Sequence, residues 1–256
     1  AHVGFADVGR NYSEALAVAR DANNRLVVVG LARAQGGVFT DGSIVIARFN
    51  ANGTLDPTFG QDGRTRIDAD TFSVGSGVAI QGDGKIVVAG YAAPDTSGAS
   101  MRRMILFRFN PNGLADSTFG AGGMTSVEIG SGGQITAMRL QPDGRIVVAG
   151  QVFHASGGNG DFYVARYRTN GTPDTSFGAT GNFPNLTASV RIDFGGRDSA
   201  SDLAIQSDGR IVLVGTTEAK GGNAFAVARL SAGGLLDSTF GTGGRVTTSF
   251  VDGDTG

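Results

Sequence analysis

Four aspartates recur along the chain at a spacing that could bring their carboxylates together. Each stands three residues after a glycine and three residues before a phenylalanine. They are Asp56, Asp116, Asp174 and Asp237. A ring of carboxylates would suit calcium, which takes oxygen ligands. In the alternative interpretation, each carboxylate accepts backbone N–H groups within its own turn. Because a feature repeated at one fixed spacing is typical of scaffold, we favour the structural interpretation.

Two other residue types recur in step with these aspartates. Arginines at a constant distance before them are expected to be their ion-pair partners, namely Arg48, Arg108, Arg166 and Arg229. The phenylalanines after them are Phe59, Phe119, Phe177 and Phe240. We expect each ring to pack as a wedge between neighbouring repeats, burying roughly 150–200 Å².

Other candidate chemistry is sparse. The two histidines, His2 and His154, are far apart, and the absence of cysteine removes thiolate nucleophiles and Cys-based zinc sites. No zincin or serine-hydrolase motif occurs, although two acids from separate loops could still form a glycosidase pair. The glycine-rich segment 157–161 resembles a calcium-binding repeat but occurs once, which favours a hairpin tip. We therefore expect no cofactor, with calcium as the alternative.

The elements that position these residues belong to four copies of one unit. The string IQGDGKIVVAG (80–90) has close matches ending at Gly30, Gly150 and Gly215, so the period is 60, 60 and 65 residues. The second half of the unit, such as RFNPNGLADSTFG (108–120), recurs in the same order. We place the repeats at approximately 14–68, 77–129, 136–194 and 201–250, within one domain that covers residues 1–256.

Each repeat is predicted to contain four strands. A short apolar strand such as 78–80 precedes an Asp-Gly turn (Asp83-Gly84, for example), a pair that tolerates positive φ. The second strand, such as 146–149, is apolar throughout, which predicts burial of both faces. The third alternates, as in 162–167, and the fourth follows the Phe-Gly element, as in 246–250. No helical periodicity competes with this all-β interpretation.

A sheet with both faces buried needs a neighbour on each side. Radial stacking into a β-propeller of four four-stranded blades, each of about sixty residues, meets that need and leaves only short edges. The alternatives are that the chain is part of a larger propeller, or that the units form a linear β-solenoid.

These repeated residues resemble a known family. The pattern Asp-Gly-Arg/Lys-Ile-Val-x-x-Gly, followed by Arg-Phe-Asn-x-Asn-Gly-x-x-Asp-x-Thr-Phe-Gly, is similar to the bacterial delta-60 repeat. The resemblance covers nearly the whole chain. It implies a β-propeller fold and a bacterial protein that is exported or displayed at the cell surface. It implies no catalytic residues.

The connections between strands differ in how strongly they vary. The first-to-second and third-to-fourth turns are nearly the same in all repeats, whereas the other connections differ: 31–43, 69–76, 91–103, 130–134, 151–160, 195–200 and 216–223. In a propeller these variable loops share one face, and binding residues are often held on such loops. The polar candidates for a ligand face are Arg33, Asp95, Arg102, Arg103, His154, Asp161 and Lys220.

The two ends of the chain carry one strand more than four repeats require. Residues 1–8 resemble a fourth-type strand, and 245–250 is another. The chain could come from a longer array, or its first strand could close the ring. Alternatively, the surplus strand could pair with another copy, which would give a homo-oligomer or a filament.

Composition narrows the function further. A net charge of −2 gives no electrostatic reason to expect nucleic acid, and no apolar run is long enough for membrane insertion. Residues 1–4 lack a basic and apolar leader, so we expect any signal peptide to have been removed. We predict a non-enzymatic, exported structural or binding module whose partner is a protein, a glycan or its own copies. A propeller hydrolase or lyase with a metal or acid pair near the central channel is the alternative.

Overall fold

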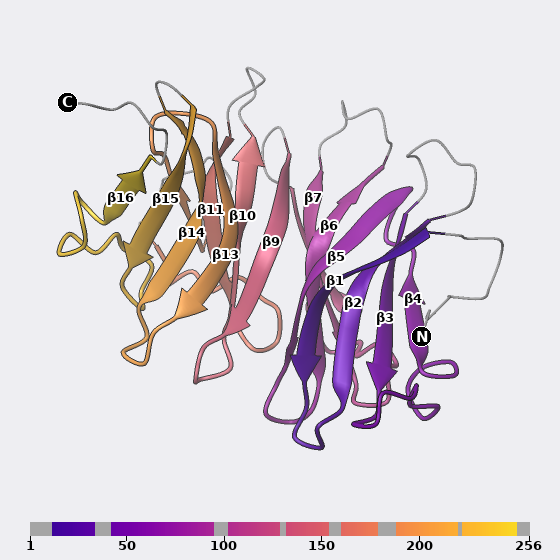
Figure 1. The fold of residues 1–256 in the computed structure, drawn as a ribbon. Coiled ribbons are helices and arrows are strands. Elements are labelled where there is room, and N and C mark those ends of the chain that lie inside the picture. The colour runs from indigo at the N-terminus through magenta and orange to yellow at the C-terminus, as the bar shows by residue number, and fades with distance from the viewer. Residues whose placement is uncertain are drawn as a thin grey trace. The chain divides into compact units, whose positions relative to one another are not determined.

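The computed structural model describes residues 12–33, 42–94, 102–128, 132–153, 160–178, 188–219 and 222–249. Regular structure in these ranges consists of β-strands alone (Figure 1). They form four four-stranded antiparallel sheets, in each of which strands consecutive in the chain are neighbours. None of the described residues forms a helix long and apolar enough to cross a membrane. The prediction of four all-β, four-stranded repeats is confirmed.

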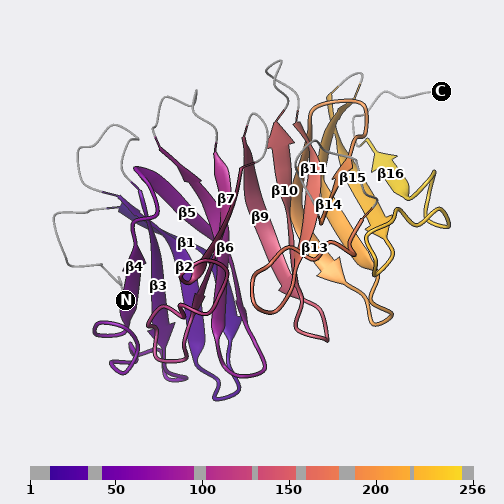
Figure 2. The same cartoon turned by 180° about the vertical axis from the view of Figure 1, so that it is seen from behind.

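The chain divides into two compact units, residues 1–135 and 136–256. The first unit contains the first and second sheets, which are visible from both sides in Figures 1 and 2. The first sheet consists of β1 (Tyr12–Arg20), β2 (Leu26–Arg33), β3 (Ser43–Phe49) and β4 (Arg64–Ile67). The second consists of β5 (Phe72–Ile80), β6 (Ile86–Ala93), β7 (Arg103–Phe109) and β8 (Met124–Glu128).

The second unit holds the third and fourth sheets, apart from the first residues of β9. The third sheet consists of β9 (Gly133–Leu140), β10 (Ile146–Phe153), β11 (Gly160–Tyr167) and β12 (Ser189–Ile192). The fourth consists of β13 (Asp198–Ile205), β14 (Ile211–Ala219), β15 (Gly222–Leu230) and β16 (Arg245–Thr248).

Asp-Gly turns join the first and second strands of a sheet, and the two residues have different roles in the turn. Only the glycine takes a positive φ, as at Gly84 (83°) and Gly209 (83°). The aspartate instead accepts a hydrogen bond from the backbone N–H two residues on, for example Lys85 N to Asp83 Oδ1 at 3.1 Å. In the first sheet Asn24 takes the glycine's place with φ 61°, which asparagine tolerates better than most residues.

The glycines that mark the repeat period lie opposite a β-bulge. The register of β5 against β6 shifts between Gly75 and Gly77, next to Gly90. A Cβ at Gly90 would lie 1.9 Å from the carbonyl oxygen of Val74, and one at Gly30 would lie 1.8 Å from that of Glu14. The bulged strand occupies the space of a side chain, so the position requires glycine.

Apolar side chains between two sheets form the core of each unit. In the first unit, Val29 and Ile44 of the first sheet pack with Ile86 and Ile105 of the second. In the second unit, Val147 and Phe162 of the third sheet pack with Leu213 of the fourth. As predicted, β6 and β10 are buried along nearly their whole length. Each sheet therefore uses its neighbour to shield a face that it could not bury alone.

Two details of the prediction are wrong. Much of the segments predicted as variable loops is strand: β5 begins at Phe72, β13 begins at Asp198, and β14 and β15 extend to Ala219 and from Gly222. The ladder continues there through backbone hydrogen bonds, which do not need an apolar side-chain pattern. In addition, β14 is not buried on both faces, since Val214 is 41% exposed.

Candidate functional site

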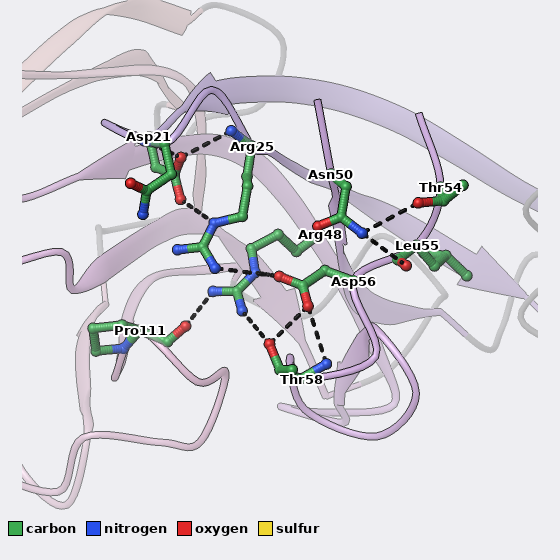
Figure 3. Close-up of polar contacts among 10 residues, drawn as sticks. Asp21, Arg25, Arg48, Asn50, Thr54, Leu55, Asp56, Thr58 and Pro111 are labelled. Atoms are coloured by element: carbon green, nitrogen blue, oxygen red, sulfur yellow. Dashed lines mark hydrogen bonds and ion pairs between the residues drawn. The ribbon is translucent and has the colours of Figure 1, made fainter. Parts of the chain in front are cut away.

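The repeated aspartates form the same ion pair in all four sheets. In the first sheet, Arg48 Nε donates to Asp56 Oδ2 at 2.8 Å, and Thr58 donates through its N–H and its hydroxyl to Asp56 Oδ1 (Figure 3). The equivalent Arg–Asp distance is 2.8 Å in each of the other three sheets. The arrangement joins the third strand to the turn that follows it, as a scaffold element would.

A second cation reaches each of these carboxylates from the first-to-second turn. Arg25 Nη1 lies 3.3 Å from Asp56 Oδ2 (Figure 3). The equivalent cations are Lys85, Arg145 and Arg210, at 3.0–3.2 Å. Two cations and a hydroxyl surround each carboxylate, so its charge is already balanced by the protein.

The same contacts lower the pKa of the repeated carboxyls. For Asp56 and Asp116, the hydrogen bond from the neighbouring threonine hydroxyl is the largest contribution to the lowered pKa. Burial raises the pKa of Asp174, but the hydroxyl and amide of Ser176, with Arg166 and Arg145, outweigh it. The Thr239 hydroxyl and amide lower the pKa of Asp237 to about 2. All four are therefore ionised at neutral pH.

The recurring phenylalanines pack against the arginines of these ion pairs. The Arg48 guanidinium lies 4.7 Å from the centroid of the Phe59 ring, and Arg166 lies 4.7 Å from that of Phe177. Phe59 and Phe177 are buried, and Phe119 is fully buried as well, whereas Phe240 is half-buried. Arg48 also donates to the carbonyl oxygen of Pro111, which follows the third strand of the second sheet (Figure 3). This Arg–Asp–Phe element therefore links the first sheet to the second.

Two of the predicted ligand-face residues meet in one arrangement, which we call the Arg–aromatic row: Tyr12, Arg33, Phe72, Tyr91 and Arg102. The Arg33 guanidinium lies 5.6 Å from the Tyr12 ring centroid and 5.2 Å from that of Phe72. Phe72 and Tyr91 have centroids 6.2 Å apart, and Arg102 lies 5.3 Å from the Tyr91 centroid. Two cations thus contact three aromatic rings along the variable edge of the first two sheets.

The row is amphipathic and partly accessible. Tyr12 is 51% exposed, and the other four side chains are partly buried. Burial raises the pKa of Tyr91, while Arg102 and Arg33 lower it. The Tyr12 hydroxyl donates to Glu14 at 2.9 Å. Planar apolar faces and guanidinium groups are therefore presented together.

The remaining ligand-face candidates are dispersed. Arg103 pairs with Asp70 at 2.9 Å and donates to the Ala69 carbonyl oxygen. Asp161 lies in the second unit, is 1% exposed and pairs with Arg191. Asp95, His154 and Lys220 lie outside the described residues.

Sequence reasoning missed the aromatic members of the row. Tyr12, Phe72 and Tyr91 come from three strands. Phe72 and Tyr91 fall in segments predicted to be variable loops, and Tyr12 precedes the first predicted repeat. The weak signal available was an aromatic residue at the edge of a variable segment in each of the first two repeats. Asp193 and Asp198, which lie near Asp161, were missed as well, because nothing in the repeat pattern marks them.

A chain of four-stranded antiparallel sheets, each built from one sixty-residue unit with the same Arg–Asp–Phe element, is a β-propeller repeat protein. The chain belongs to the family described as "Domain of unknown function (DUF5122) beta-propeller", whose model matches residues 22–59, 81–119, 141–177 and 206–240. Each match runs from a first-to-second turn to a recurring phenylalanine. No curated protein matches the chain.

Proposed function

We propose that the chain is a non-enzymatic binding module whose contact surface is the Arg–aromatic row, and that its ligand is an acidic glycan. The observation that supports this proposal most directly is the placement of Arg33 between the Tyr12 and Phe72 rings. The row lies where the repeats differ, while the shared Arg–Asp–Phe unit serves the scaffold. Residues that vary on a rigid frame are the usual place for recognition.

The chemistry of the row favours a sugar acid. Partly accessible aromatic faces offer an apolar platform for the C–H face of a sugar ring. Guanidinium groups pair with carboxylates through charge-assisted hydrogen bonds, and each such bond contributes about 1.5–3 kcal/mol. A uronic-acid oligosaccharide presents both features at once. We further propose, from the resemblance to delta-60 repeats, that the module acts outside a bacterial cell.

Calorimetric titration with a uronic-acid oligosaccharide tests this function. We expect binding by the native chain and an affinity about tenfold lower for Arg33→Gln and for Arg102→Gln. Arg139→Gln is the matched control, because Arg139 is a half-exposed arginine of the second unit, paired with Asp202. A neutral oligosaccharide that binds equally well, or variants that bind like the native chain, would refute the proposal.

A second function, self-association, is favoured by apolar side chains on the outer faces of two sheets. Val18 of the first sheet and Phe225 of the fourth are each 60% exposed. Within the second unit, the Phe177 ring covers Gly234. Gly53 is the equivalent glycine of the first sheet, and among the described residues no atom lies within 4 Å of a Cβ added to it. We propose that the fourth sheet of one copy packs on the first sheet of another. The strand-pairing version, which uses residues 1–8, lies outside the described residues.

Sedimentation velocity over a range of concentrations tests self-association. We expect oligomers that Phe225→Ser abolishes. Leu114→Ser is the control, since Leu114 is also 60% exposed but lies in a third-to-fourth turn of the second sheet. A chain that stays monomeric at all concentrations would contradict this second function.

A further inference from the structure

Three carboxylates meet at the junction between the third and fourth sheets. Asp161 is the second residue of β11 and pairs with Val152 of β10, Asp193 follows β12, and Asp198 begins β13. One oxygen of each lies within 4.8 Å of the others. Asp161 and Asp198 are buried, at 1% and 0% exposure, and Asp193 is exposed. Buried carboxylates this close repel one another strongly unless cations balance them.

Arginine side chains from two strands, β12 and β16, reach this cluster. Arg191 forms an ion pair with Asp161, and its second contact, to Asp193, is long at 3.9 Å. Arg245 donates to the backbone carbonyl oxygen of Asp193. The Phe194 backbone N–H donates to Asp198 Oδ2 at 2.7 Å.

Two buried oxygen atoms at this junction have no hydrogen-bond partner among the described residues: Asp198 Oδ1 and Thr217 Oγ1. Thr217 is 2% exposed. It is the cross-strand partner of Asp198 in the β13–β14 ladder, so both side chains are on the same face of the sheet. Leaving such groups unpaired costs about 1–3 kcal/mol each, which points to a further binding partner.

The first unit provides an internal comparison. By strand register, Asp161 corresponds to Ser43, Asp198 to Ser73 and Thr217 to Ala92. At this first-unit junction the Ser43 hydroxyl donates to Asp68, and the Ser73 hydroxyl donates to the Gly42 carbonyl oxygen.

The balance of charge also differs between the two junctions. Asp68 and Arg66 of the first unit correspond to Asp193 and Arg191. The fold thus needs one acid and one arginine here, whereas the second unit adds two carboxylates and a hydroxyl.

We propose that Asp161, Asp193 and Asp198, with the Thr217 hydroxyl, form a site for a hard divalent cation, for which Ca²⁺ is the best fit. Calcium takes oxygen ligands at about 2.3–2.6 Å, so ligands on opposite sides of the ion lie about 5 Å apart. The carboxylate oxygens already meet that limit without movement. Magnesium needs shorter distances and stricter octahedral geometry.

Access and burial both suit an ion. Asp193 lines a surface hollow of about 720 Å³ together with Gly195 and Arg245. An ion can therefore reach the exposed carboxylate from solvent and bind the two buried ones beneath it. A sugar ring could not contact carboxyls as buried as Asp161 and Asp198, so a glycosidase acid pair is disfavoured here.

Titration of the chelator-treated full chain with CaCl₂, followed by calorimetry and thermal unfolding, tests the site. We expect one Ca²⁺ per chain, a higher melting temperature with Ca²⁺, and weaker binding of Mg²⁺. Asp193→Asn, at an exposed position that should fold normally, and the isosteric Asp198→Asn should each lower the Ca²⁺ affinity at least tenfold. Asp68→Asn, at the equivalent first-unit position, should leave it unchanged.

Three results would overturn the proposal. They are the absence of Ca²⁺ uptake by the native chain, uptake that survives both Asp193→Asn and Asp198→Asn, and an equal loss in Asp68→Asn. Equal affinity for Mg²⁺ would overturn the assignment to calcium.

Discussion

The ring of Phe177 lies directly against the backbone of Gly234. A Cβ added to Gly234 would lie 2.8 Å from two carbons of that ring. Next to this contact, Gly178 N donates to the Gly233 carbonyl oxygen at 2.8 Å. Phe59 and Gly113 repeat the relationship in the first unit, where Gly60 N donates to Asn112. In both units, a phenylalanine at the end of the first repeat thus packs on a turn glycine of the second.

Replacing the turn glycine separates this packing from backbone strain. Gly234→Ala should cost about 1–2 kcal/mol because φ is +87°, and about 1–3 kcal/mol more because the methyl group meets Phe177. Gly53→Ala has nearly the same φ, +81°, but no atom lies within 4 Å of the added Cβ, so only the first cost applies. Urea unfolding measures both, and equal losses would contradict the wedge contact.

Truncating the phenylalanines should reveal how differently they are buried in the third and fourth repeats. Phe177→Ala removes a buried ring and should cost about 3–5 kcal/mol. Phe240 is half-buried, so Phe240→Ala should cost about half as much or less. The free energy of unfolding of the two variants provides the test. If Phe240→Ala were as costly as Phe177→Ala, the fourth sheet would be packed as tightly as the third.

Acid should destabilise the fold through the repeated aspartates. The pKa of Asp56, Asp116 and Asp174 is lowered in the folded state. A carboxyl whose pKa is lowered by folding contributes its full stabilisation of the folded state when the pH is above the unfolded pKa of 3.8. This stabilisation is lost as the pH falls through the folded-state pKa.

Urea midpoints measured from pH 6 to pH 2 should therefore fall steeply below pH 4. Asp116→Asn should be less stable at pH 6, because it leaves the buried Arg108 without its charged partner, and its acid dependence should be flatter. An Asp116→Asn curve parallel to that of the native chain would show that this carboxyl does not contribute.

The period glycines should be intolerant of any side chain. Gly90→Ala would place a methyl group 1.9 Å from the Val74 carbonyl oxygen, so the bulge would have to open. We expect a loss of more than about 3 kcal/mol, or failure to fold. Gly82→Ala, where no atom lies within 4 Å, should change stability by less than about 0.5 kcal/mol. Thermal unfolding distinguishes them, and a stable Gly90→Ala would contradict the bulge.

The repeat pattern predicted much of the fold because local and shared features decide it. Turn residues such as Gly84 and apolar runs such as 146–149 act within a few residues of themselves. The strand ends were less predictable, because backbone hydrogen bonds continue past the apolar pattern, as between Glu218 and Asn223. The bulges were not predictable either, since the glycine signal stands on the strand opposite the irregular one.

Sequence by itself determined what every repeat must share: four strands, their turns, and the recurring Arg, Asp and Phe. These positions are visible because four copies meet the same physical requirement. Only the tertiary structure decided what differs between copies, including the row that places Arg33 between Tyr12 and Phe72 and the cluster of Asp161, Asp193 and Asp198. Each of these arrangements forms where strands of two sheets meet. Because such a contact between distant residues occurs only once, it produces no repeating pattern in the sequence.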